Sequence, residues 1–234
     1  MEAGFADIEE NIKRIRENLS EAALKSGRSP DDIRIMAVTK TVPFERVNFA
    51  ASRGLTLLGE NRVQEFLQKK EHYVKNAEVH FIGHLQSNKI KYIIDSVEMI
   101  ESVDSVKLGE EISGRAGKIG RTMDILCEVN VGGEESKSGF SPEEVTEAVC
   151  RLAELPGIRV RGLMTIPPPA ADGGSLYFEK MQRIFEDTAA RKIPGTDIDT
   201  LSMGMSADYA EAVRFGSTLV RIGSGLFGAR NYPV

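Results

Sequence analysis

The most constraining feature of this chain is an alternation, repeated eight times, of short apolar runs with segments of helical character. The runs expected to be β-strands cover residues 33–39, 55–58, 78–82, 98–102, 124–131, 159–165, 200–203 and 217–222. Because strands that alternate with helices are joined by right-handed parallel crossovers, eight such units favour a closed (β/α)8 TIM barrel. The alternative is a doubly wound open sheet, which eight strands make less natural.

An extra helix is expected before the first strand. Ile8, Ile12, Ile15 and Leu19 recur at spacings of four, three and four, which is one stripe of an amphipathic helix, and the pattern stops near Ser26-Gly27. The 234 residues contain no fixed-period repeat, linker or low-complexity tract. We therefore expect one domain that spans residues 1–234, a length within the range of a single barrel.

Composition narrows the classes of partner. Thirty basic and 35 acidic residues give a formal net charge of -5, which argues against nucleic acid as a partner without excluding a local phosphate pocket. Cys127 and Cys150 lie in no metal-binding pattern and are expected to be reduced structural cysteines. The chain shows no secretion leader and no apolar run near the roughly 20 residues that a bilayer requires, so we expect a cytoplasmic protein without a membrane partner.

Two basic residues are placed where parallel α/β proteins carry their chemistry. Lys40 follows the first strand and shares strand parity with Met36 and Val38, so it is expected to point into the barrel as a candidate amine nucleophile. Arg221 lies in the last strand, on the face opposite the apolar residues that suit the outer helices, and is also expected to point inward. For Lys40 the plain alternative is a lysine whose ammonium group reaches solvent from a strand end.

The remaining candidates follow strands two, seven and eight. Asn61 either caps the next helix or forms a hydrogen bond with a polar ring substituent, and the sequence does not decide between these roles. Ser206 suits a helix N-cap and equally a phosphate contact. Gly223-Ser224-Gly225 can expose consecutive N–H groups, in loops where barrels commonly bind phosphate.

An amine, an inward arginine and a phosphate cradle on one rim fit a ligand with an aldehyde, a ring nitrogen and a phosphate. Pyridoxal 5'-phosphate (PLP) carries all three groups. A partly uncharged lysine forms an imine with the aldehyde, and an arginine near the ring nitrogen disfavours its protonation, which weakens the cofactor as an electron sink.

Seven ordered blocks of sequence resemble the pyridoxal phosphate homeostasis protein family, also called YggS or PROSC. The blocks are Ala37-Val-Thr-Lys40-Thr, Gly59-Glu-Asn61, His80-Phe-Ile-Gly-His-Leu-Gln-Ser-Asn-Lys89, Ser136-Lys-Ser-Gly139, Arg161-Gly-Leu-Met-Thr-Ile166, Leu201-Ser-Met-Gly-Met-Ser206-Ala-Asp208 and Val220-Arg-Ile-Gly-Ser-Gly-Leu-Phe-Gly-Ala-Arg230. They extend from the first strand almost to the C-terminus, and none departs from the family pattern. The resemblance implies a fold-type III PLP-binding barrel similar to the N-terminal domain of alanine racemase.

The resemblance also implies a role for each candidate residue. Lys40 would be the Schiff-base lysine, Asn61 would lie beside the ring, and Arg221 would face the pyridine nitrogen. The implied phosphate ligands are Ser206, Gly223 and Ser224, and His80 and Met203 are implied as neighbours of the cofactor. Members of this family bind and buffer PLP and influence vitamin B6 balance without robust turnover. A monomer that passes PLP to apo-enzymes is therefore the expected form.

Two other functions remain open at this stage. A weak PLP-dependent amino-acid racemase would need an acid/base group on each face of the substrate, and none of the five tyrosines is an obvious second base in a chain that ends at Val234. A phosphosugar-binding barrel enzyme would use Lys40 without a cofactor. Lys137, in the polar loop 132–139, is expected to be either a solvated lysine or a transient acceptor of the aldehyde as the cofactor enters and leaves.

Overall fold

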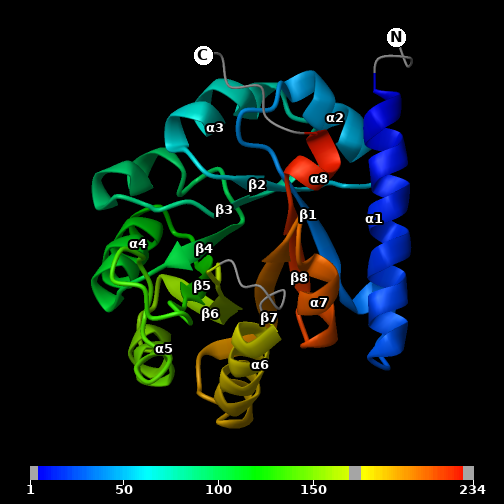
Figure 1. The fold of residues 1–234 in the computed structure, drawn as a ribbon. Helices are drawn as coiled ribbons and strands as arrows, with labels where there is room; N and C mark the ends of the chain where they lie inside the picture. Colours follow the sequence, from blue (N-terminus) through cyan, green and yellow to red (C-terminus); the bar gives the residue numbers. More distant parts are fainter. Residues whose placement is uncertain (1–4, 169–174, 229–234) are drawn as a thin grey trace.

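The computed structural model, which describes residues 5–168 and 175–228, contains a closed barrel of eight parallel strands (Figure 1). The strands are β1 (Arg34–Val38), β2 (Leu57–Glu60), β3 (Glu78–Phe81), β4 (Met99–Val103), β5 (Met123–Glu128), β6 (Ile158–Met164), β7 (Thr196–Met205) and β8 (Leu219–Ile222). Each strand pairs with the next along the chain, and β8 pairs with β1 through the register Met36 to Arg221. The predicted (β/α)8 barrel is confirmed. Residues 1–4 and 229–234 at the two ends of the predicted domain, and residues 169–174, lie outside the described residues.

Strand boundaries differ from the predicted ones in two informative places. β7 begins at Thr196, four residues before the predicted start. The apolar pattern did not predict this first half because it is polar and only partly buried. Asp199 in this extension contacts Arg161 of β6, so charge pairing and not apolar patterning continues the strand. β5 ends at Glu128, because the chain then turns so that the N–H of Asn130 donates to the carbonyl of Phe140 at 2.9 Å.

Helices follow seven of the eight strands. They are α2 (Phe44–Ser52), α3 (Val63–Lys69), α4 (Val106–Lys118), α5 (Val145–Ala153), α6 (Ser175–Ala190), α7 (Tyr209–Arg214) and α8 (Ser224–Phe227). The segment after β3 is a 3-10 helix, Ser87–Tyr92, in place of the predicted α-helix, and only Ile90 within it is buried. A single buried residue gives no apolar stripe long enough to stabilise an α-helix against the barrel.

The core has two layers because successive strand residues face opposite sides. The larger layer lies between strands and helices and includes Ala37, Leu58, Ile125 and Val220, all fully buried. Inside the barrel, smaller apolar clusters are formed by Met36, Val38, Leu57, Ile82 and Leu219, and by Met99, Leu126 and Met164. The interior apolar filling is therefore discontinuous, and polar side chains occupy the rest of the space.

The predicted N-terminal helix is α1 (Ala6–Lys25), which packs on the outside of the barrel against α2, α7 and α8 (Figure 1). Its expected stripe of Ile8, Ile12, Ile15 and Leu19 is buried. The Asn11 side chain donates to the carbonyl of Leu226 at 3.0 Å, and the Asn18 side chain donates to the Tyr209 hydroxyl at 3.1 Å. This helix therefore braces the loops after β7 and β8 from outside.

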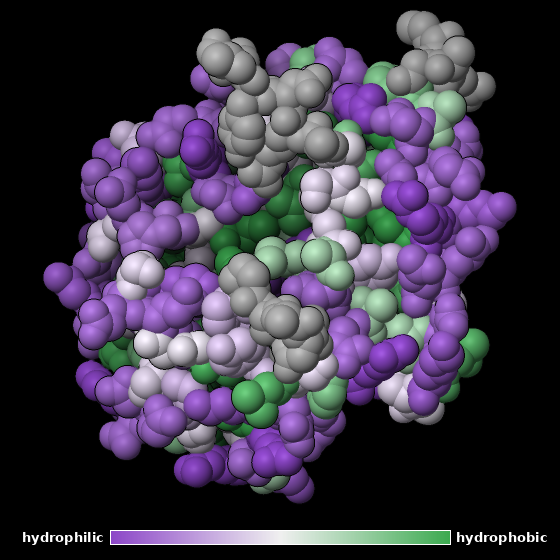
Figure 2. Space-filling model, viewed as in Figure 1, coloured by the Kyte–Doolittle hydropathy of each residue, from purple (hydrophilic) through white to green (hydrophobic). Residues whose placement is uncertain are grey.

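Hydrophilic residues cover most of the face shown in Figure 2, and hydrophobic residues gather toward its middle. Within the described ranges, no helix has the length and apolarity that a membrane span requires. Cys127 is buried and Cys150 is partly buried, and neither forms a disulfide. Burial raises the pKa of the Cys127 thiol to about 12, which fits an inert core residue.

Candidate functional site

Five of the predicted site residues follow the carboxyl ends of four strands. Lys40 follows β1, Asn61 follows β2, Ser206 follows β7, and Gly223 and Ser224 follow β8. In a parallel barrel these ends lie on one face, so the residues are brought to one rim, which we call the barrel mouth.

Lys40 continues the inward-facing series of β1. Met36 and Val38 pack inside the barrel whereas Ala37 packs against the helices, and the inward direction predicted for Lys40 would continue this series two residues beyond the end of β1. The lysine is partly buried. Thr41, directly after it, has a φ of 61°, a left-handed conformation that is costly for a β-branched residue.

A buried polar group, which we call the outer cluster, lies behind Lys40 and consists of Thr39, Glu60, Lys69 and Tyr73. The Glu60 carboxylate accepts from the Thr39 hydroxyl at 2.7 Å and from the Tyr73 hydroxyl, and it pairs with the Lys69 ammonium at 2.8 Å. Lys69 also donates to the Thr39 carbonyl at 2.9 Å. Burial and the nearby Glu60 carboxylate raise the pKa of Tyr73, so its hydroxyl stays a donor. The cluster ties α3 to the strand ends that carry Lys40 and Asn61.

Asn61 does not cap α3, so that alternative from the sequence is not what the structure shows. The helix begins at Val63 with Arg62 as its N-cap, and no side chain caps it. Gly83 lets the β3 loop approach Asn61 closely, because a Cβ at Gly83 would lie 2.0 Å from the Asn61 carbonyl oxygen. The Asn61 amide remains a candidate ligand group at the mouth.

Ser206 does not cap the next helix either. α7 begins at Tyr209 with Asp208 as its N-cap. The Ser206 Oγ instead accepts from the N–H groups of Gly223 at 3.2 Å and Gly225 at 2.9 Å. Two backbone donors from the β8 loop thus converge on a hydroxyl from the β7 loop, and exposed Ser224 lies between them. Converging N–H donors of this kind form an anion cradle.

Arg221 points into the barrel, as its strand parity predicts. Its guanidinium is 3% exposed, with NH1 donating to Ser202 Oγ at 2.6 Å and NH2 donating to the Thr165 carbonyl at 2.7 Å. Burial lowers the pKa of Arg221, and the carboxylates of Glu101, Glu128 and Asp208 oppose that shift. The arginine remains a cation, held by β6 and β7.

His80 lies deeper than Lys40 and Asn61. It pairs in register with Gly59, two residues before Asn61, which places it about 7 Å further down the barrel. Its Nδ1 lies 2.7 Å from Glu101 Oε1 and its Nε2 lies 2.9 Å from Glu78 Oε1. Burial alone would lower the pKa of His80, but the hydrogen bonds to these two carboxylates raise it to about 9. Both ring nitrogens are therefore engaged inside the barrel.

Met203 is separated from the other candidates. It is fully buried and belongs to the apolar core between strands and helices, whereas its neighbour Ser202 faces inward. Its side chain therefore does not line the mouth.

Sequence reasoning missed the interior acid Glu101 and its partner Ser202. Glu101 is 0% exposed in the middle of β4, and its Oε2 accepts from Ser202 Oγ at 2.6 Å. A carboxylate inside the short strand Met99-Ile-Glu-Ser-Val103, flanked by apolar residues at both ends, is the sequence feature that could have identified it, because buried acids require partners.

Glu128 was also missed, although it ends a predicted strand. Leu126 faces the barrel interior and Cys127 faces the helices, so Glu128 faces inward at the mouth. Burial, followed by the nearby Asp104 carboxylate, raises the pKa of Glu128 to about 7, and Arg221 opposes the shift. An inward carboxyl that changes charge near neutral pH thus accompanies Lys40 at the rim.

Lys137 lies in the loop after β5 and pairs with Glu134. The Asn130 side chain fixes this loop by donating to the carbonyls of Glu134 at 2.8 Å and Lys137 at 3.3 Å. The pocket around Lys137 also contains Lys180 of α6, which places it over the outer helices. The lysine is partly exposed and held by an acid, as a solvated loop lysine would be.

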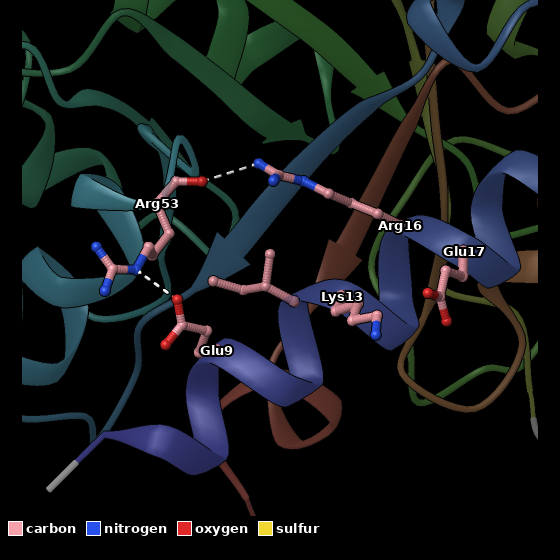
Figure 3. A pocket seen from close by; sticks show the side chains of 6 residues that line it. Glu9, Lys13, Arg16, Glu17 and Arg53 are labelled. Carbon is pink, nitrogen blue, oxygen red and sulfur yellow. Dashed lines mark hydrogen bonds and ion pairs between the residues drawn. The ribbon is translucent and has the colours of Figure 1, made fainter. Parts of the chain in front are cut away.

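A separate hollow of about 400 Å³ lies along α1 and is lined by Ile12 and by the charged residues labelled in Figure 3. Two contacts cross this hollow: Arg53 Nε donates to Glu9 at 3.0 Å, and Arg16 donates to the Arg53 carbonyl at 2.9 Å. Arg53 precedes β2, so the hollow lies toward the amino ends of the strands and away from the barrel mouth. In the part of the chain that the structure describes, no group of three or more potential metal ligands gathers.

Comparison with known proteins agrees with this geometry. Residues 10–231 match the family described as "Alanine racemase, N-terminal domain". The chain is 42% identical over 226 residues to the pyridoxal phosphate homeostasis protein of Aquifex aeolicus, covering 95% of this chain and 98% of the relative. The protein of the same name from Escherichia coli K12 is 37% identical over 230 residues, covering 97% of this chain and 98% of the relative.

Solved structures extend the comparison. PipY of Synechococcus elongatus, solved with PLP bound, superposes with a TM-score of 0.78 at 30% identity and covers 92% of this chain and 100% of its own. An unknown protein from Bifidobacterium adolescentis gives a TM-score of 0.93 at 35% identity, with 97% of each chain covered. Alanine racemase of Clostridium difficile, at 17% identity, shares the fold with a TM-score of 0.76 over 98% of this chain and 58% of its own. The chain belongs to the alanine racemase N-terminal domain family and, within it, to the pyridoxal phosphate homeostasis proteins.

Proposed function

We propose that this protein binds PLP at the barrel mouth through Lys40 and serves vitamin B6 homeostasis as a carrier. The observation that carries the proposal is the convergence of an amine, an inward arginine and a phosphate cradle on one rim, from β1, β7 and β8. The likeness to PipY, which was solved with PLP bound, supports the same ligand. When bound, PLP supplies an aldehyde that forms a C=N bond with an amine.

The residues present fit each part of that ligand. The N–H groups of Gly223 and Gly225 already converge on Ser206 Oγ, so a phosphate oxygen can receive the same donors. A Cβ at Gly225 would lie 3.2 Å from the Ser206 Cβ, so the cradle needs a residue without a side chain there. Asn61 supplies an amide for a polar ring substituent, and Lys40 supplies the amine.

Arg221 favours binding of PLP over catalysis by it. Its guanidinium has only donors, so it can pair with an unprotonated ring nitrogen but cannot stabilise a protonated one. Without that protonation the ring is a poorer electron sink, which suits retention and release. The names of the relatives, which describe homeostasis, agree with a non-enzymatic role.

Lys40 is tested by borohydride reduction of the PLP-loaded protein followed by peptide mapping. We expect the reduced cofactor on Lys40, and we expect the Lys40→Ala variant to lose both the label and the visible absorption band. Lys107→Ala, an exposed lysine of α4, is the matched control and should keep both. A wild-type protein that stays colourless after addition of PLP would contradict the proposal and would favour a phosphosugar ligand.

The racemase alternative has a separate test. We expect the PLP-loaded protein to leave single enantiomers of amino acids essentially uninverted. Inversion at ordinary enzyme rates, about 1 to 1000 per second, would replace the carrier by an enzyme.

We further propose that a cytoplasmic monomer of one domain, residues 1–234, delivers PLP to apo-enzymes that depend on it. The placement of the candidate residues in loops at the carboxyl ends of the strands is consistent with direct release. Reactivation of a PLP-dependent apo-enzyme by the loaded protein, compared with the same concentration of free PLP, measures this transfer.

A further inference from the structure

A continuous line of hydrogen bonds crosses the barrel interior from the amino end of β3 to Arg221. Glu78 contacts His80 at 2.9 Å, and His80 contacts Glu101 at 2.7 Å. Glu101 contacts Ser202 at 2.6 Å, and Ser202 contacts Arg221 at 2.6 Å. We call this line the interior relay.

The direction of every hydrogen bond in the relay is set by the groups at its ends. Arginine only donates, so Ser202 Oγ accepts from NH1 of Arg221. The single proton of the Ser202 hydroxyl is then donated to Glu101. Ionised Glu101 and Glu78 only accept, so the His80 ring between them donates from both nitrogens and is an imidazolium. The pKa values agree: His80 is raised to about 9, and Glu78 is lowered to about 2, first by the hydrogen bond from His80.

Charges alternate along the relay, and three of its four charged members are removed from water, whereas Glu78 is 36% exposed. Glu101 is 0% exposed, His80 is 1% exposed and Arg221 is 3% exposed. Burial alone would raise the pKa of Glu101, yet the hydrogen bond from His80 and the charges of His80 and Arg221 keep it low. Because an unpaired buried charge is costly, each member requires its neighbours.

We propose that His80, Glu101 and Ser202 are positioning residues that fix the orientation of Arg221, so that a remaining N–H of its guanidinium is held ready for the PLP ring nitrogen. This inference rests on the proposed function and deepens it. Ser202 and the Thr165 carbonyl take one donor each from the guanidinium fork and fix its plane, and the other donors of the fork remain for a ligand. His80 therefore acts on the cofactor through Arg221 and not by contact.

The relay is tested with Ser202→Ala, which removes the one atom that joins Glu101 to Arg221. We expect the variant to keep PLP on Lys40, to shift the pH profile of the visible band, and to release PLP about tenfold faster, because the orientation of Arg221 is then held by the Thr165 carbonyl alone. Ser202→Thr, which restores the hydroxyl, should recover wild-type behaviour. Ser217→Ala removes an equally buried hydroxyl that bonds only to backbone carbonyls, and it should leave the profile unchanged.

Two further readouts keep the inference falsifiable. If Ser202→Ala does not fold, His80→Gln is measured instead and should shift the same pH profile. In the apo-protein, NMR should show both His80 ring nitrogens protonated at neutral pH, and a neutral ring would overturn the relay. A folded variant whose PLP release and pH profile match those of the wild type would also overturn the relay, and the proposed function would stand as long as the wild type loads PLP at Lys40. Failure of the wild type to load PLP would instead refute the proposed function itself.

Discussion

The amino end of the barrel and the phosphate cradle at its mouth differ in what their polar groups bind. At the amino end, side chains neutralise one another: Arg159 binds Asp124 at 2.8 and 2.9 Å, and Arg34 binds Glu78 at 2.6 Å. At the mouth, the backbone donors of Gly223 and Gly225 meet only a serine hydroxyl. At the amino end these side-chain charges are already paired within the protein. At the mouth the two N–H donors are bound only to a neutral hydroxyl, so an anion could still bind them.

The largest effect that separates the two regions is expected from two arginine variants. Arg221→Met removes the buried cation that donates to Ser202 and to the Thr165 carbonyl, leaves His80 as the one cation beside Glu101, and should lower the free energy of unfolding by about 3–5 kcal/mol. Arg159→Met removes a cation whose side chain is 48% exposed and should cost less than about 1 kcal/mol. Chemical denaturation of both apo-proteins measures the difference. Equal losses of unfolding free energy would show that the buried Arg221 is no more important for stability than the exposed Arg159.

Two acids on the same face of β5 provide the next comparison. The pKa of Glu128 is about 7 in the fold against 4.5 ordinarily, so its stabilising contribution is complete below pH about 4.5 and is lost as the pH rises through about 7. Glu128→Gln should therefore be more stable than the wild type above pH 7 by about 1–3 kcal/mol.

Asp124 supplies the matched variant, because its carboxylate, unlike that of Glu128, is paired with two arginines. Asp124→Asn weakens its bonds with Arg159 and Arg161 and should be less stable than the wild type at the same pH by up to about 1 kcal/mol. Unfolding curves between pH 5 and about 8 test both variants. A Glu128→Gln protein whose stability falls with pH as steeply as that of the wild type would show that another group titrates.

A glycine pair tests the cradle with little effect on stability. Gly225→Ala should weaken PLP binding about tenfold, because the new Cβ would crowd Ser206 at 3.2 Å and hold the phosphate away from the N–H donors. Gly117→Ala in α4 meets no atom within 4 Å and should stabilise the protein by about 0.5–1 kcal/mol without altering PLP affinity. Titration with PLP distinguishes them, and unchanged affinity in Gly225→Ala would move the phosphate elsewhere.

The smallest effect is expected at Lys137, outside both regions. If this lysine accepts the aldehyde transiently, Lys137→Ala should slow loading and transfer by less than about tenfold, since a partly exposed contact contributes up to about 1 kcal/mol. Stopped-flow loading compared with Lys107→Ala measures this. Identical rates would leave Lys137 as a loop lysine paired with Glu134.

The sequence by itself determined the barrel, the outer helix α1 and the inward direction of Arg221, and it predicts the same direction for Lys40. Each of these depends on a period, two residues in strands and 3.6 in helices, and a period is visible in a single chain. The same reasoning left Asn61 and Ser206 between capping and binding, because their residue types suit both roles.

The tertiary structure decided the questions that depend on distant partners. It gave Ser206 the donors of Gly223 and Gly225, moved Met203 into the outer core, and joined His80 to Glu101 and Ser202, which are up to 122 positions apart along the chain. Hydrogen bonds across a closed barrel connect strands that are remote in sequence, so no local pattern encodes them. The sequence shows the chemical type of each side chain. The buried partner of that side chain is decided only when the barrel closes.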